Sequence, residues 1–151
     1  MSSYLDESSQ LAAYVAAVQV GSQTAFAAVY EREAQAYWAA LPCAMVLPKA
    51  TGSTEGEYGT VTNETHHLWD VKILYPWEDT DACTTAFYTL LDATLTALRA
   101  SSSVNFGGRT SYAVIGPQDF GYLSGQSDTP DIRTATITIH ARDLVTRTPT
   151  P

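Results

Sequence analysis

The sequence predicts an α+β domain: a mixed or antiparallel β-sheet with an N-terminal helix and one long central amphipathic helix. Two kinds of hydrophobic pattern support this. Apolar residues recur at the three- and four-residue spacing of a helix near the N-terminus, and again over about 20 residues in the middle of the chain. Elsewhere apolar and polar residues alternate, as they do in half-buried strands.

The length and composition fit one folded domain. The chain has 151 residues, of which 45% are hydrophobic and 16% charged, whereas about 25% are charged in an average globular protein. A chain of this length buries enough surface to fold without disulfides or metals. We expect a single domain over residues 1–145 and a disordered tail at residues 146–151, because the sequence Thr-Arg-Thr-Pro-Thr-Pro offers little to pack.

The charge argues against nucleic acid as a specific partner. Sixteen acidic and eight basic residues give a net charge of −8, the wrong sign for neutralising phosphates over a broad surface. No apolar run approaches the roughly 18 to 20 residues that span a bilayer, and the polar start does not resemble a signal peptide. We therefore expect a cytosolic protein, with Cys43 and Cys83 as reduced thiols in apolar surroundings.

Two helices are predicted in the first 41 residues. The first has Asp6 or Ser8 available as its N-cap and Gly21 as its stop. A second is favoured over residues 26–41 by its many alanines and by aromatic residues at helical spacing, and it ends before Pro42. The apolar stripe of the first helix consists of Leu11, Tyr14, Val15 and Val18.

A buried strand, a polar connection and a second strand follow. The apolar run at residues 43–47 is typical of a buried strand. Residues 49–65 contain three glycines, five threonines and no apolar periodicity, so we expect a long loop that is functional or mobile. Residues 66–75 alternate as a strand does. The predicted inner face of that strand carries Trp69, Val71, Ile73 and Tyr75.

The central helix and two closing strands complete the prediction. Acidic and hydroxyl side chains at residues 76–81 can cap free amide groups, and so predict the start of the helix. Its stripe consists of Phe87, Leu90, Leu91, Leu95 and Leu98, with Thr94 as the polar member. Strands are predicted at residues 110–115 and 132–143. In the last strand Ala135, Ile137, Ile139 and Ala141 share one face, and Thr134, Thr136, Thr138 and His140 share the other.

Few residues could form a metal or catalytic site. Neighbouring residues of a strand point to opposite faces, so His66 and His67 cannot bind one ion without a bend. A nucleophilic Cys43 would lie in an apolar run, where a thiol stays protonated. The candidates for metal or acid-base chemistry are His66, His67, Asp70 and His140. We expect no catalytic residue, no metal and no cofactor, and predict that the protein is not an enzyme.

The order of the segments resembles that of a known family. The chain has an N-terminal helix, a segment around Val29-Tyr30-Glu31, a Leu-Pro-Cys-Ala-Met-Val-Leu-Pro run, a long loop, a strand ending in Leu74-Tyr75-Pro76, an amphipathic helix and two closing strands, the last containing Ile137-Thr-Ile-His-Ala-Arg142. Over nearly the whole chain, this layout resembles the tail-terminator, or tail-completion, proteins of long-tailed bacteriophages. The resemblance implies a sheet with its helices packed on one face. It also suggests an extended segment near Tyr30, where the local pattern favours helix, and we expect a mixture of the two.

The resemblance implies a structural virion protein of the tail or neck, present in the host cytoplasm during assembly. Members of the family close into a hexameric ring that caps the tail tube, stops its polymerisation and offers a surface to the head-tail connector or stopper protein. Genomic DNA would pass through the lumen without specific binding, because an acidic wall repels phosphates. No membrane is implied.

A ring of identical subunits needs two different complementary surfaces on each, because its contacts are heterologous. The predicted loop at residues 49–65 is one candidate surface, and the polar face of the last strand is the other. The candidate interface residues are Glu55, Glu57, Tyr58, Thr134, Thr136, Thr138 and His140.

Other functions stay open at this point. Another neck or minor tail component, such as a head-closure or connector protein, would share the size and acidity of this chain. A small α+β ligand-binding or hydrolytic domain would use the histidines and Asp70. A secretion or host-interaction module is a third class.

Overall fold

The computed structural model describes residues 4–49, 54–58, 62–101, 111–126 and 128–146. Its elements in chain order are α1 (Tyr4–Ala16), β1 (Gln19–Val20), β2 (Gln23–Thr24), β3 (Ala28–Tyr30), the 3-10 turn η1 (Tyr37–Ala39), β4 (Cys43–Pro48), β5 (Thr54–Tyr58), β6 (Thr62–Pro76), α2 (Asp81–Ser101), β7 (Ser111–Leu123) and β8 (Ile132–Thr146). The predicted α+β class is confirmed.

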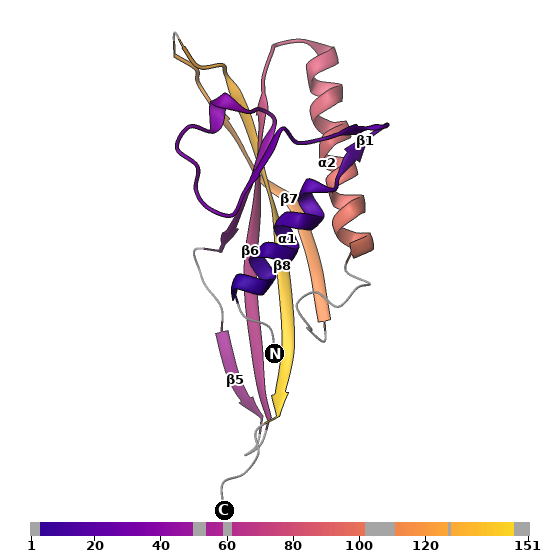
Figure 1. The fold of residues 1–151 in the computed structure, drawn as a ribbon, viewed down its shortest axis with the longest axis vertical. Coiled ribbons are helices and arrows are strands. Elements are labelled where there is room, and N and C mark those ends of the chain that lie inside the picture. Colours follow the sequence, from indigo (N-terminus) through magenta and orange to yellow (C-terminus); the bar gives the residue numbers. More distant parts are fainter. Residues whose placement is uncertain (1–3, 50–53, 59–61, 102–110, 127, 147–151) are drawn as a thin grey trace, which may run out of the picture.

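The main sheet has the strand order β3-β4-β6-β8-β7, and β5 pairs with β6 off this path. β3 is parallel to β4, and the other pairs are antiparallel. β6 and β8 pair along their whole length, from Thr62 opposite Thr146 to Pro76 opposite Ile132. In Figure 1 these two strands form the long axis of the molecule, with β5 beside their lower ends.

Both helices pack on one face of this sheet, as the resemblance implies. Strand side chains alternate between faces, and the odd-numbered residues of β6 and β8 are buried in the same cluster as the helix stripes. Figure 1 shows α1 crossing in front of β6 and β8, with α2 to one side. Val18, which follows the end of α1, is also in this core. The core residues from the helices and these strands are Leu11, Val15, Trp69, Val71, Ile73, Phe87, Leu90, Leu91, Leu95, Leu98, Ala135, Ile137, Ile139 and Ala141. The predicted core faces of the first helix, of the central helix and of these strands are therefore confirmed.

A second, smaller apolar cluster lies on the opposite face of the sheet. Cys43 and Met45 of β4 pack there with Leu74 and Ile132. The segment between β3 and β4 covers them with Ala34, which is buried, and with Tyr37 and Leu41, which are partly buried. The sheet thus has apolar contacts on both faces where β4 pairs with the C-terminal part of β6.

The helix predicted over residues 26–41 is wrong, whereas the extended segment that the resemblance suggests near Tyr30 is confirmed. Residues Ala28–Tyr30 form β3, which pairs in parallel with β4 so that Ala28 lies opposite Cys43 and Tyr30 opposite Met45. Only η1 is helical in this segment. The alanines favour a helix locally, but strand pairing and burial of Phe26 outweigh that preference of a few tenths of a kcal/mol per residue.

The long irregular loop predicted at residues 49–65 is also wrong where the structure describes it. Thr54–Tyr58 form β5, which pairs with residues 62–66 at the start of β6. Threonine favours strands. The segment lacks an apolar face, however, so it shows no period-two hydrophobic pattern from which a strand could be predicted.

Several helix and strand boundaries also differ from those predicted. α1 already contains Tyr4, so Asp6 and Ser8 lie inside the helix rather than at its N-cap. Gly21 instead lies in the two-residue turn between β1 and β2, where its φ of 64° suits a tight hairpin. β8 extends through Thr146, and residues 147–151, where the tail is predicted, lie outside the described residues.

Candidate functional site

The candidate acid-base residues do not meet. His67 faces the helices. Asp70 lies three residues further along β6, and His140 pairs with Leu68, the neighbour of His67, so both belong to the opposite face of the sheet. The side chain of His66 is outside the described part of the structure. Across the described ranges, no group of three or more His, Cys, Asp or Glu residues could hold a metal ion.

Glu7 and His67 form a buried pair that the sequence reasoning missed. The Glu7 side chain is fully buried, and its Oε2 lies 2.7 Å from Nδ1 of His67. Trp69 Nε1 donates a longer hydrogen bond of 3.4 Å to Oε1 of the same carboxylate. A buried carboxylate needs such partners, because burying it without them costs several kcal/mol. The pair joins the first turns of α1 to β6, so we interpret it as structural.

The polar face of β8 is partly engaged within the chain. Thr138 is only 3% exposed and donates a hydrogen bond of 2.9 Å to Asp70, while Gln118 donates one of 2.8 Å to Thr138. Lys49 completes the network, with Nζ 3.8 Å from Asp70 Oδ1. Thr134 is buried, whereas Thr136 and His140 are half-buried. The predicted interface role of these residues stays a prediction, with Thr136 and His140 offering the most surface.

The other predicted interface residues lie on β5. Glu55, Glu57 and Tyr58 are opposite Thr65, Asn63 and Thr62 of β6, in that order. The structure describes their backbone but not their side chains. Their interface role also stays a prediction.

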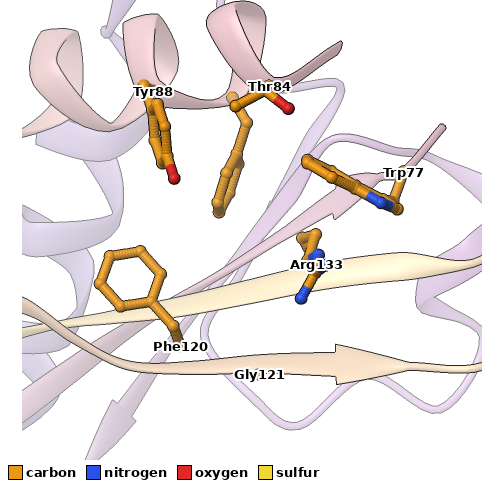
Figure 2. Close-up of a pocket in the computed structure, with 7 residues that line it drawn as sticks. Trp77, Thr84, Tyr88, Phe120, Gly121 and Arg133 are labelled. Carbon is orange, nitrogen blue, oxygen red and sulfur yellow. The ribbon is translucent and has the colours of Figure 1, made fainter. Parts of the chain in front are cut away.

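An aromatic pocket lies between α2 and the strands β7 and β8. Its volume is about 330 Å³, and it is lined by Trp77, Thr84, Phe87, Tyr88, Phe120, Gly121 and Arg133. Figure 2 shows Tyr88 extending from α2 toward Phe120 on β7, Thr84 nearby on α2, and Trp77 and Arg133 on the other side of the pocket. Phe87 forms the buried wall, with its ring centroid 6.3 Å from that of Trp77 and 6.5 Å from that of Phe120.

Arg133 is held against two aromatic rings. Its Cζ lies 4.6 Å from the centroid of the Trp77 ring and 4.9 Å from that of Tyr122, which are cation-π distances. Tyr122 in turn donates a hydrogen bond to Asp131, which also accepts the N–H of Gly125 at 2.7 Å. The Gly125 amide and the Tyr122 hydroxyl hold the pKa of Asp131 below its usual range. The guanidinium is therefore fixed in place at the pocket.

The rim of the pocket is unusually apolar for a surface. Phe120 and Tyr88 are 57% and 55% exposed. Tyr122, which lies opposite Arg133 on the edge strand β7, is also exposed on this face. The exposed Ile115 and Leu123 of β7 lie opposite Thr138 and Ile132, so they belong to the other face of the sheet. We call the pocket and this rim the pocket surface. Tyr, Trp, Phe and Arg are the residue types enriched at protein-protein contacts, so the composition indicates an interaction surface.

The Cys43 thiol is not placed to act as a nucleophile in this structure. Both cysteines are free, as expected. Burial raises the pKa of the Cys43 thiol to about 11, so it stays protonated at neutral pH. Cys83 is half-buried, and its Sγ accepts the N–H of Glu78 at 3.3 Å and donates to Pro76 O at 3.6 Å.

Two signals in the sequence could have led to the missed residues. Glu7 precedes Leu11 by four positions and so continues the apolar stripe of the first helix. Arg133 is on the same strand face as the apolar residues Ala135 and Ile137, so its cation belongs to the face that is predicted to be buried. A charged residue in an apolar register indicates a buried pair or a stacked cation.

No protein-family model matches the chain, and no curated protein matches it. Neither helix, over the residues that the structure describes, is both long and apolar enough to cross a membrane.

Proposed function

We propose that this chain is a structural subunit of a long-tailed phage virion, a tail terminator that closes into a ring on the end of the tail tube. Its fold has the layout that the family resemblance implies, with both helices on one face of the sheet. The ring would end tube polymerisation and present a surface for head-tail joining.

The observation that carries the proposal is the exposed pocket surface. A monomer that works alone gains nothing from leaving Phe120 and Tyr88 more than half exposed beside a sheet edge. In a ring, a neighbouring copy covers this surface. Because the candidate acid-base residues are split between the two faces of the sheet, assembly explains the molecule better than turnover does.

The charge of the chain fits a ring that surrounds DNA. Each subunit carries a net charge of −8, so a lumen lined by such subunits repels phosphates and lets DNA slide. β5 carries Glu55 and Glu57. The double variant Glu55→Lys with Glu57→Lys is expected to slow DNA passage in assembled particles, and unchanged genome delivery would argue against an acidic lumen at β5.

Tube growth gives the direct test of the proposed function. Purified tail-tube subunits polymerise with and without this chain, and electron microscopy measures tube length and end structure. We expect shorter tubes that carry a ring at one end. Phe120→Ser, a change at an exposed position, is expected to abolish capping, whereas Leu5→Ala at a second exposed position is expected to retain it.

Two other results would redirect the proposal. Binding to the head connector without any effect on tube length would favour a head-closure or other neck component. Unchanged tube length together with no binding to either structure would contradict a role at the tail or neck.

A further inference from the structure

Exposed apolar side chains occur in two separate places, at the pocket surface and at Trp38. The pocket surface flanks β7, one edge of the sheet. Trp38, 42% exposed, lies on η1. Its neighbour Tyr37 packs in the small cluster on the other face of the sheet, where Cys43 Sγ lies 3.9 Å from Tyr37 O. β4, which carries Cys43, is next to the opposite edge strand β3. Each subunit therefore offers two different apolar surfaces.

The segment that leads from β3 to Trp38 carries two acids, whereas the pocket surface carries a cation. Glu31, Arg32 and Glu33 follow β3 directly. Glu31 accepts hydrogen bonds from Ser8 and Ser9, and Arg32 stacks over Tyr30, which leaves Glu33 exposed. Within the described part of the chain, neither Glu33 nor Arg133 makes an ion pair. We call Trp38 with Glu33 the Trp38 surface.

We infer that Trp38 of one subunit occupies the aromatic pocket of the next, with Glu33 facing Arg133. The inference rests on ring formation in the proposed function and names the contact that would close the ring. The indole ring would stack among Phe87, Tyr88 and Phe120 in a space of about 330 Å³. Hot spots on one partner tend to pair with hot spots on the other, and Trp and Arg are the residues most often found there.

Charge favours this head-to-tail contact over a two-fold contact between two pocket surfaces. Two copies of a chain with net charge −8 repel each other, so the contact needs a cation opposite an acid. A two-fold contact with its axis at the pocket would bring Arg133 against Arg133. The Trp38 surface brings Glu33 instead, and repetition of such a contact between unlike surfaces forms a ring when the rotation between subunits closes.

Leu5 is the competing occupant, because it is 74% exposed. It has no aromatic face to stack on the rings that line the pocket. Leu5→Ala is therefore the matched control, since it removes an exposed apolar side chain outside both surfaces.

Self-association of single variants is the first test. Analytical ultracentrifugation of the full chain is expected to show that Trp38→Ala and Phe120→Ser each raise the dissociation constant by at least about 30-fold, the effect of losing a hot-spot side chain. Circular dichroism is expected to show unchanged folding, because both positions are exposed. Glu33→Lys is expected to weaken association by about 10-fold, and most at low salt. Leu5→Ala is expected to assemble as the wild type does.

A mixing experiment separates a head-to-tail contact from a two-fold one. Trp38→Ala retains an intact pocket, and Phe120→Ser retains an intact Trp38. An equimolar mixture of the two is expected to form one-to-one dimers that grow no further, visible in native mass spectra. If the mixture stays monomeric while the wild type assembles, the inference is overturned.

Other outcomes are equally decisive. If Trp38→Ala assembles as the wild type does, or if Leu5→Ala dissociates instead, the proposed contact is wrong. Neither result contradicts the formation of a ring. A wild-type chain that stays monomeric at every concentration and forms no ring on tube ends would also overturn the contact. If the variants lose the ring but the wild-type ring fails to cap tubes, the contact is supported and the proposed function is rejected.

Discussion

The carboxylate of Glu7, in the first turns of α1, lies 2.7 Å from Nδ1 of His67 on β6, and both side chains are buried. This contact spans 60 residues of sequence. It fixes the N-terminal helix against the sheet at the point where β6 leaves the core and continues alongside β5. The arrangement of helices on one face of the sheet therefore depends partly on a polar contact in an otherwise apolar layer.

Loss of this contact is expected to be costly. Glu7→Ala should lower the free energy of unfolding by about 3 kcal/mol, because it removes the buried carboxylate that joins His67 and Trp69 to α1. Urea unfolding followed by fluorescence measures the change. Thr96→Ala, at an exposed position of α2, is the control and should stay within about 0.5 kcal/mol of the wild type. A loss below about 1 kcal/mol for Glu7→Ala would show that the pair is not a structural link.

The network on the opposite face gives a second stability prediction. Thr138→Val removes a hydroxyl that donates to Asp70 and accepts from Gln118. We expect a loss of about 1 to 2 kcal/mol, because both partners are left partly unsatisfied. Thr136→Val on the same face of β8, at a half-buried position, should cost less than about 0.5 kcal/mol. Equal effects at the two positions in urea unfolding would contradict the network.

The hydrogen bonds to Asp131 predict a pH dependence near the pocket. The pKa of Asp131 is lowered from 3.8 by the Gly125 amide and the Tyr122 hydroxyl. The folded state therefore binds this proton less tightly than the unfolded state does, and the resulting stability is present above pH 3.8 and lost as the pH falls through the folded pKa. Asp131→Asn should be less stable than the wild type at neutral pH and approach it in acid. A difference that does not change with pH would refute this.

Burial of Cys43 predicts slow thiol chemistry. With its pKa raised to about 11 and its side chain enclosed, Cys43 should resist alkylation by iodoacetamide at neutral pH in the folded protein. Cys83, which is half-buried, should react sooner. Peptide mass spectrometry over time distinguishes the two thiols, and unfolding in urea should equalise them. Faster labelling of Cys43 than of Cys83 would contradict its burial.

The elements with strong hydrophobic periodicity could be predicted from the sequence. α2 and the core faces of β6 and β8 follow directly from spacing, because a single buried face imposes a period of 3.6 or 2 residues. β3 could not be predicted in this way, since it depends on pairing with β4 across the chain. β5 was missed because it has no apolar face. The strand predicted at residues 110–115 covers only the first part of β7, whose pairing with β8 is interrupted between Ile115 and Gly121.

The candidate site was less predictable than the fold. The pocket joins Trp77, Tyr88, Phe120 and Arg133, which are far apart in the sequence and belong to four different segments. Their convergence depends on how α2 packs beside β7 and β8, and no local pattern encodes that. The polar face of β8 could be predicted because it follows from alternation within one strand.

Native mass spectrometry of the wild-type chain over a concentration series, with negative-stain images of the same samples, tests the central claim of ring assembly most directly. The account predicts one closed species, a hexamer if the family resemblance holds, with a central hole in the images. A species that stops at a two-fold dimer, or a monomer at every concentration that also fails to form rings on tube ends, would contradict it.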